Sequence, residues 1–299
     1  LHFSKKNENL TTFMMNPIFH ERVQRGHSKL TRSQVALAQY ILQHGEEVPF
    51  LSSVELGNRV HVSDATVTRF CIALGYSGYA DLQKDLQKWL QMRLAPSERM
   101  EKTPRKKGED LYLEIFNRDI QNLKETSAEL RPEQFREVIR ILNRARKVFI
   151  VGLRSSFGLA VLAHSHFRSI RNGVTLVESN WGMMPDLLVD IEPPDAMLAI
   201  GFPRYTRATL EVARYAKGRG CQVIAITDSI LSPLARTSDF VIQAKISGLG
   251  FINFYTSAVA IINCLSAGLS MANPTRSIQT LKTIEGELKK WGIWAAQKL

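Results

Sequence analysis

The sequence predicts two domains, an all-α N-terminal domain carrying a helix-turn-helix and a C-terminal α/β domain with a doubly wound parallel sheet. Three observations lead to this prediction. The chain has 299 residues, which suits two domains of about 100–200 residues each. Before residue 95, apolar side chains recur at helical spacing. After residue 146, short apolar runs alternate with helical segments, the pattern of parallel strands joined by crossover helices.

Composition excludes several classes of protein. Hydrophobic residues make up 44% and charged residues 22% of the chain, which excludes a disordered or collagen-like protein. The cysteines, Cys71, Cys221 and Cys264, lie far apart without a CxxC pair, so we expect no disulfide framework, no metal and no cofactor. The formal net charge of +11 favours an anionic partner. It is spread over the chain, at +3 for residues 1–100, +3 for 101–150 and +5 for 151–299.

The ends of the two domains follow from local composition. Residues 1–15 contain no signal-peptide core, and we expect them to be a disordered or dispensable tail of a cytoplasmic protein. Residues 95–109 contain prolines, a glycine and a basic run, which predicts a basic linker between a helical N-terminal domain at 16–94 and an α/β C-terminal domain at 110–299. The uncharged run at 251–272 is long enough to cross a bilayer. Its six Asn, Ser and Thr side chains favour a buried helix shared with a partner subunit, and no membrane association.

The first domain is expected to hold four helices. Apolar spacing and capping residues such as Thr31 place them at 30–42, 51–60, 64–74 and 79–92. In the third helix, Val67, Phe70, Cys71 and Leu74 follow the spacing of a buried stripe, and Ser63 is placed to cap the helix.

The opposite face of this third helix is small and basic, which would let it approach base edges and phosphates in the major groove. The predicted partner is therefore a double-stranded DNA operator, with Lys29 as a further phosphate contact. The alternative is a plain helical bundle in which Arg69 is only solvated. The predicted DNA-binding residues are Arg32, Arg59, Ser63, Asp64, Ala65, Thr66, Thr68 and Arg69.

The second domain begins with helical segments at 111–128 and 131–143, followed by the alternating pattern. The predicted strands are 147–152, 174–178, 196–200, 221–227 and 240–243, with helices at 157–171, 181–191 and 206–219. In such a sheet, ligands bind beyond the carboxyl ends of the strands. The loops at 152–158 and 201–206 combine glycine, arginine and hydroxyl groups with a following helix, which suits a phosphate or carboxylate. The predicted ligand-binding residues are Arg154, Ser155, Ser156, Ser179, Arg204, Tyr205 and Thr206.

Other functions compete with a ligand-sensing role for this domain. A dinucleotide site is disfavoured because GxGxxG is absent from the first loop. An isomerase needs a positioned base, and only Glu178 and Asp228 are acidic candidates at strand ends, while His164 and His166 lie on a helix. We therefore predict no catalytic residue and no enzyme. A sugar-phosphate isomerase or transferase with an appended helical domain is the alternative, and an interaction module with a degenerate pocket is a third hypothesis.

Two blocks of sequence resemble a known family. Residues 62–79, VSDATVTRFCIALGYSGY, resemble the helix-turn-helix of the RpiR family of bacterial transcriptional regulators, and residues 225–235 resemble a late-strand motif of its sugar isomerase (SIS) domain. The likeness covers nearly all of residues 16–290. It implies a homodimeric or homotetrameric regulator whose SIS domain senses a phosphosugar, with the helix around 251–272 at a subunit interface.

The ligand loops depart from the family pattern. The usual first loop resembles GxGxS and the usual third loop resembles SxSGxT, and only Ser156 and Thr206 keep clear equivalents. Arg154 and Arg204 add positive charge, and Tyr205 is expected to replace a glycine and narrow the pocket. The expected ligand is thus a small anionic metabolite, either a sugar phosphate or a sugar acid.

Overall fold

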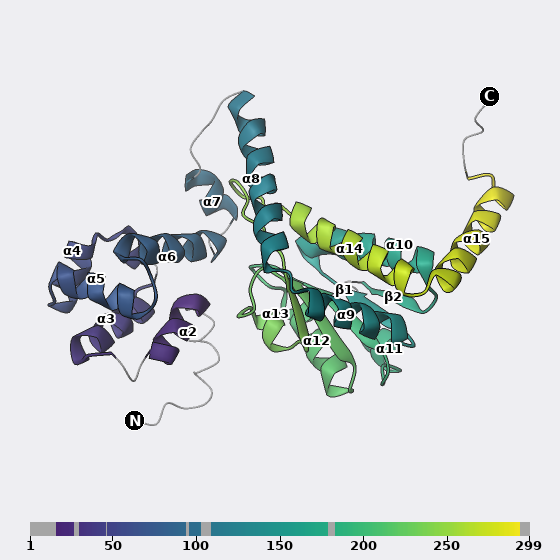
Figure 1. Ribbon diagram of the computed structural model, residues 1–299, viewed down its shortest axis with the longest axis horizontal. Coiled ribbons are helices and arrows are strands. Elements are labelled where there is room, and N and C mark those ends of the chain that lie inside the picture. The colour runs from purple at the N-terminus through teal and green to yellow at the C-terminus, as the bar shows by residue number, and fades with distance from the viewer. Residues whose placement is uncertain are drawn as a thin grey trace. The chain divides into compact units, whose positions relative to one another are not determined.

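The computed structural model describes residues 16–26, 30–45, 47–93, 96–102, 109–178 and 183–293 (Figure 1). The chain divides into two compact units, Leu1–Arg99 and Met100–Leu299. Helix α7 (Pro96–Lys102) lies within the segment predicted as a linker. Residues 103–108, which complete the basic run, and the predicted tail at 1–15 lie outside the described residues.

The N-terminal unit is all-α, as predicted, and each of the four expected helices is present. Local capping explains where three of them begin. Thr31 and Ser52 form capping boxes with Gln34 and Glu55, and the Ser63 hydroxyl accepts a hydrogen bond from the Thr66 backbone N–H. The elements are α2 (Pro17–Gly26), α3 (Arg32–Gln43), η2 (Val48–Phe50), α4 (Ser53–Val60), α5 (Asp64–Ala73) and α6 (Tyr79–Arg93).

Helix α2 was not predicted, because it contributes few apolar side chains to the core. Of these, Phe19 and Val23 are buried, and the Phe19 ring meets the Phe70 ring edge to face at 6.3 Å. The cluster that they join includes Leu37, Leu56 and other fully buried side chains from every α-helix of the unit. The recognition-helix candidate α5 is therefore held against a continuous apolar core.

The C-terminal unit contains five strands in one parallel sheet, ordered β2-β1-β3-β4-β5. The predicted doubly wound sheet is thus confirmed, and all five strands lie within one residue of each end predicted for them. The strands are β1 (Val148–Val151), β2 (Val174–Val177), β3 (Ala196–Ile200), β4 (Gln222–Thr227) and β5 (Phe240–Gln243).

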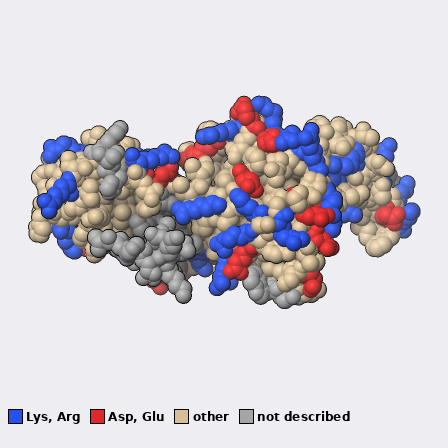
Figure 2. All heavy atoms as spheres, turned by 90° about the horizontal axis from the view of Figure 1, so that it is seen from below, with Lys and Arg blue, Asp and Glu red and all other residues tan. Residues whose placement is uncertain are grey.

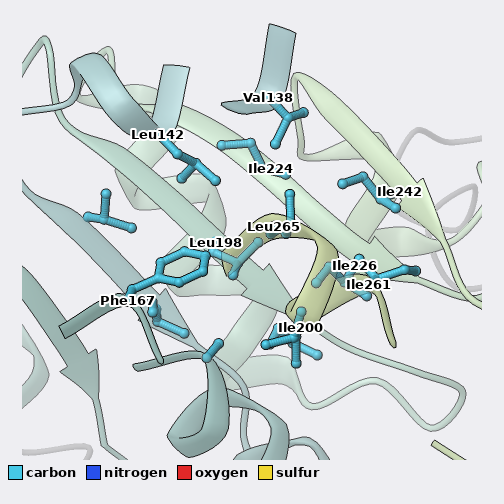
Figure 3. Close-up of a cluster of buried hydrophobic side chains, with 14 of the residues drawn as sticks. Val138, Leu142, Phe167, Leu198, Ile200, Ile224, Ile226, Ile242, Ile261 and Leu265 are labelled. Carbon is cyan, nitrogen blue, oxygen red and sulfur yellow. The ribbon is translucent and has the colours of Figure 1, made fainter. Parts of the chain in front are cut away.

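Helices cover both faces of this sheet, which explains why the strands are almost wholly apolar. On one face, Val138, Phe167 and Leu265 pack from three helices onto strand residues such as Leu198 and Ile226 (Figure 3). The helices of that face are α9 (Pro132–Arg144), α10 (Phe157–Ile170) and α14 (Thr256–Ala272). The other face is covered by α11 (Met184–Leu188), α12 (Arg207–Gly218) and α13 (Pro233–Arg236).

Three helices differ from the sequence-based expectation. The helix expected at 181–191 is confined to α11, and the helix expected from residue 251 begins only at Thr256. Helix α15 (Pro274–Lys290) was not predicted, since it buries few side chains. No single helix in the described ranges is long and apolar enough to cross a membrane. Only α14 and α15 together have that length and composition, and the chain bends by 107° between them.

Candidate functional site

The turn between α4 and α5 is a close contact of two backbones. The Val62 N–H donates to the Gly57 carbonyl at 2.8 Å, and His61 adopts a left-handed conformation with φ 57°. A Cβ added at Gly57 would lie 2.6 Å from the Val62 carbonyl oxygen, which no side chain tolerates. A glycine at position 57 therefore permits the compact turn that joins the two helices.

Helix α5 has one buried face and one polar face, as its spacing predicts. Val67, Phe70 and Cys71 are fully buried, and Leu74 is nearly so. Burial raises the pKa of the Cys71 thiol to about 12, so this cysteine is an inert core residue. Of the predicted DNA-binding residues on this helix, Asp64, Ala65 and Arg69 are exposed, and Thr66 and Thr68 are half-buried.

A chain of hydrogen bonds orders the polar face at the start of α5. The Ser63 and Thr66 hydroxyl oxygens are 2.9 Å apart, and Arg69 Nη2 donates to Thr66 Oγ1 at 3.1 Å. The guanidinium of Arg69 is thus drawn toward the N-terminal turn, where the helix dipole favours anions. Ser63, Thr66 and Arg69 are brought together at one end of the helix, in reach of one phosphate or base edge.

The other predicted phosphate-binding residues lie outside the hydrogen-bond chain of Ser63, Thr66 and Arg69. Arg59, near the end of α4, forms an exposed ion pair with Glu47 at 2.8 Å. Such a pair contributes at most about 1 kcal/mol, so Glu47 holds this guanidinium only weakly. Arg32 is exposed as the first residue of α3. Lys29 lies outside the described residues.

Sequence reasoning missed Arg22, which supports the recognition helix from α2. Its Nη1 atom donates to the carbonyl oxygens of Leu74 at 3.0 Å and Gly75 at 2.6 Å, at the C-terminal end of α5. Its guanidinium carbon also lies 4.1 Å from the centre of the Tyr76 ring. No local pattern could reveal a contact between residues more than 50 positions apart.

The candidate ligand site lies at the carboxyl ends of β1 and β3, where the connections switch from one face of the sheet to the other. Strands β1 and β3 are adjacent, and their connections run to opposite faces of the sheet, which makes this edge the topological switch point. The loops that follow these strands are the two predicted from the sequence. Gly152 permits a tight first loop, because a Cβ there would lie 2.8 Å from the Ser156 carbonyl oxygen.

Each of these loops leads into a helix whose first turn lacks a side-chain cap and an acidic residue. Ser156 is the N-cap residue of α10 and Thr206 that of α12, and neither side chain accepts a capping hydrogen bond. The first backbone N–H groups of α12 are therefore available to a ligand, whereas at α10 the Ser156 and Phe157 N–H groups donate to the carbonyl oxygens of Leu153 and Arg154. The positive ends of both helix dipoles favour an anion.

Arg154 and Arg204 both adopt the left-handed backbone conformation that favours glycine, with φ values of 55° and 69°. Both side chains are exposed, and in the part of the chain that the structure describes no hydrogen bond or ion pair holds either guanidinium. The residue that takes the place of the family's glycine is therefore Arg204 and not, as expected, Tyr205. The glycine-like backbone belongs to Arg204, since Tyr205 has no positive φ.

Tyr205 is turned toward the protein rather than offered to a ligand. Its hydroxyl donates to the carboxylate of Asp228, which also accepts a hydrogen bond from Thr227 at 3.2 Å. Thr227 in turn bonds Ser232, the residue that caps α13. Burial, followed by the neighbouring carboxylate, raises the pKa of Tyr205 well above its usual value, and burial also raises the pKa of Asp228. This network fixes the loop that carries Arg204.

Two aromatic residues of this site were missed by sequence reasoning. Tyr255, just before α14, donates from its hydroxyl to Ser155 Oγ at 3.0 Å, and its ring lies 5.3 Å from that of Phe202. The first loop is therefore tied to the start of α14. Of the other predicted ligand residues, Ser155 is exposed and Ser156 is buried, while Ser179 lies outside the described residues.

Basic and acidic side chains are interleaved over the visible face of the molecule, without one dominant basic patch (Figure 2). Within the described ranges, no cluster of three or more His, Cys, Asp or Glu side chains could hold a metal ion. Glu178, at the end of β2, is exposed.

Comparison with known proteins identifies both units. Residues 18–93 match the model of the helix-turn-helix domain of the rpiR family, and residues 141–267 match that of the SIS domain. The chain belongs to the RpiR family of transcriptional regulators. This family member is 25% identical over 230 residues to an uncharacterized HTH-type transcriptional regulator of Haemophilus influenzae, covering 74% of this chain and 80% of the relative. It is 28% identical over 220 residues to the HTH-type transcriptional regulator HexR of Pseudomonas aeruginosa, covering 73% of this chain and 75% of that one.

Solved structures agree with this RpiR-family assignment. The sugar isomerase domain of an RpiR transcription factor from Sphaerobacter thermophilus superposes with a TM-score of 0.57 at 28% identity, covering 59% of this chain and 99% of that one. The Vibrio vulnificus NanR protein, complexed with ManNAc-6P, superposes with a TM-score of 0.58 at 17% identity, covering 93% of this chain and 100% of that one. The second likeness establishes the shared fold alone.

Proposed function

We propose that this transcriptional regulator senses a small anionic metabolite, a sugar phosphate or a sugar acid. The bound anion changes the affinity of a homodimer or homotetramer for its operator in the cytoplasm. One observation carries the proposal. Two helix N-termini without a side-chain cap, and two arginines that pair with no described residue, follow the adjacent strands β1 and β3 at the switch point of the sheet, in a chain whose other unit is a helix-turn-helix.

The chemistry of this site favours an anion over a neutral sugar. The backbone N–H groups at the start of α12 and the hydroxyl of Thr206 can donate hydrogen bonds to phosphate oxygens, and the dipole of α10 adds to the positive potential. The guanidinium groups of Arg154 and Arg204 can each bind a second anionic group through a planar pair of N–H donors. The NanR protein of similar fold holds ManNAc-6P, which supports a phosphosugar as one ligand class.

We further propose that the protein is a sensor and not an enzyme. Proton transfer by an isomerase requires a base aimed at the sugar carbons. Asp228 is bound to Tyr205 and Thr227, and Glu178 is exposed, so neither candidate base is prepared for that role. We expect no conversion of glucose 6-phosphate or fructose 6-phosphate after prolonged incubation, followed by NMR. Turnover of either sugar would favour the alternative of a sugar-phosphate isomerase or transferase.

A short series of contacts offers a route from the anion to the DNA-binding unit. Tyr255 binds Ser155 in the first ligand loop. The neighbouring Thr256 donates from its hydroxyl to Asp119 Oδ2 at 2.8 Å. Asp119 belongs to α8 (Glu109–Glu129), the first described helix that lies wholly within the α/β unit. Movement of the first loop would therefore change the contacts of α8 and shift the population of DNA-competent molecules.

Thermal denaturation in the presence of candidate anions tests the ligand class. The panel is inorganic phosphate, glucose 6-phosphate, ManNAc-6P, 6-phosphogluconate and gluconate, with glucose as the neutral control. A ligand at 100 times its Kd stabilises a site by about 2.7 kcal/mol. We expect at least one phosphorylated or acidic sugar to raise Tm, and glucose to have no effect. Stabilisation by glucose alone would contradict an anion site.

Replacing Arg69 by alanine is expected to weaken operator binding at least 10-fold, because a base contact contributes about 1–3 kcal/mol. The operator would be selected from random DNA by the wild-type protein, and affinity measured by gel shift. Gln83→Ala, on α6, is the control, since the Gln83 amide donates to the Leu51 carbonyl oxygen inside the unit. An Arg69→Ala protein with full affinity and sequence preference would exclude this helix from the groove.

A further inference from the structure

Helix α8 carries an exposed apolar stripe that faces away from the body of its own unit. The stripe consists of Tyr112, Leu113, Phe116 and Ile120, whose exposed fractions are 52%, 49%, 66% and 47%. Leu113, Phe116 and Ile120 follow the i, i+3, i+7 spacing of a coiled-coil seam. In Figure 1 the N-terminal half of α8 extends beyond the layers of the α/β unit.

The other face of α8 is fixed, so the orientation of the stripe is not arbitrary. Asn122 exchanges two hydrogen bonds with the backbone of Ser247, at 2.9 and 3.2 Å. Thr126 accepts from the Lys245 N–H at 2.9 Å, and Asp119 accepts from Thr256. These contacts tie the inner face of the helix to the segment between β5 and α14. An apolar stripe held outward in this way marks a surface for another macromolecule.

The charges beside the stripe are complementary to a second copy of the same helix. Asp110 and Glu114 lie toward the N-terminal end and Lys124 toward the C-terminal end, on the same flank. An antiparallel pair would bring Asp110 of each copy beside Lys124 of the other, whereas a parallel pair would place like charges together. Both side chains are exposed, and neither forms an ion pair with another described residue.

We propose that the α8 stripe is the seam between two copies of this chain, which pair antiparallel about a two-fold axis near residue 117. That residue is midway between Asp110 and Lys124, which lie about 21 Å apart along the helix. The axis brings the two Phe116 rings together and buries both stripes, an isologous interface. The inference rests on the proposal that the protein is a homo-oligomer, and it identifies the surface that joins the copies.

Sedimentation equilibrium of the full chain tests the seam. We expect the wild-type protein to be a dimer or tetramer and Phe116→Glu to halve its mass, because a buried carboxylate opposes pairing. Met271→Glu places the same charge on another exposed apolar side chain of the α/β unit, 77% exposed, and is the control. A monomeric wild-type protein would contradict the oligomer itself. An oligomer that Phe116→Glu leaves intact would contradict only this seam.

Charge reversal tests the antiparallel arrangement without adding charge to the stripe. Asp110→Lys and Lys124→Asp are each expected to weaken self-association severalfold, and the double variant to restore it, because each reversed charge then meets an opposite one. Far-UV circular dichroism confirms that every variant remains folded. A double variant that associates no better than the weaker single variant would overturn the antiparallel pairing.

Discussion

Phe70→Ala is expected to remove most of the stability of the N-terminal unit and to abolish operator binding at 37 °C. The Phe70 side chain is fully buried and meets Phe19 edge to face. Truncating a buried phenylalanine costs about 3–5 kcal/mol, because transfer free energy is lost and a cavity remains. A typical domain has only about 5–15 kcal/mol in total. The cavity would open directly beneath the recognition helix, between α5 and α2.

The matched control lies two residues away on the same helix. Ile72 is 57% exposed, and Ile72→Ala is expected to change stability by at most about 0.5 kcal/mol. Calorimetry of the full chain distinguishes the units, because the hydrophobic clusters of the α/β unit contain no residue of the N-terminal unit. Phe70→Ala should lower one transition and leave the other unchanged. A loss below about 1 kcal/mol would show that α5 is not anchored as described.

Replacing Arg154 and Arg204 together by alanine is expected to weaken anion binding by about 100-fold or more. A hydrogen bond to a charged group contributes about 1.5–3 kcal/mol, and two such contacts would be lost. Solvent exposure of both side chains reduces this figure, which is why we expect the lower end of the range. The measurement is isothermal titration calorimetry with the anion that stabilises the wild-type protein most in the thermal panel.

The left-handed backbone at these positions permits an informative control. Arg204→Gly removes the same guanidinium as Arg204→Ala but suits φ 69°, so the glycine variant should be the more stable by about 1 kcal/mol. Both variants should lose the same anion affinity if the guanidinium binds the ligand. Arg207→Ala removes a neighbouring arginine whose guanidinium is held by Glu211, and it should change affinity less than twofold. Unequal losses for glycine and alanine would assign the effect to the backbone instead.

Sequence reasoning succeeded where the physical cause is local. The caps at Thr31 and Ser63 depend on residues three positions apart, and the strands are short β-branched runs that must be apolar on both faces. The buried stripe of α5 follows from helical spacing alone. The candidate ligand loops were predicted from the rule that ligands bind beyond the carboxyl ends of parallel strands, and their place after β1 and β3 follows from the strand order.

The parts that could not be predicted depend on contacts between distant segments. Arg22 meets the end of α5 across more than 50 residues, and Tyr255 meets Ser155 across 100. The turn of Tyr205 toward Asp228 depends on the pairing of β3 with β4, which the periodicity of one strand does not contain. A left-handed arginine such as Arg204 has no signal in a single sequence, because glycine is the residue expected there.

We infer that an anion bound at the β1–β3 edge acts on the operator-binding unit through Tyr255, Thr256 and α8. Fluorescence anisotropy of labelled operator DNA, with and without a saturating amount of the anion identified above, tests it most directly. Coupling free energies are typically about 1–3 kcal/mol, so we expect the anion to change operator affinity at least 5-fold in the wild-type protein. Thr256→Val, which keeps the shape but removes the hydrogen bond to Asp119, should reduce that change while leaving anion affinity intact. An anion that binds at this edge yet leaves the wild-type operator affinity unchanged would contradict the account.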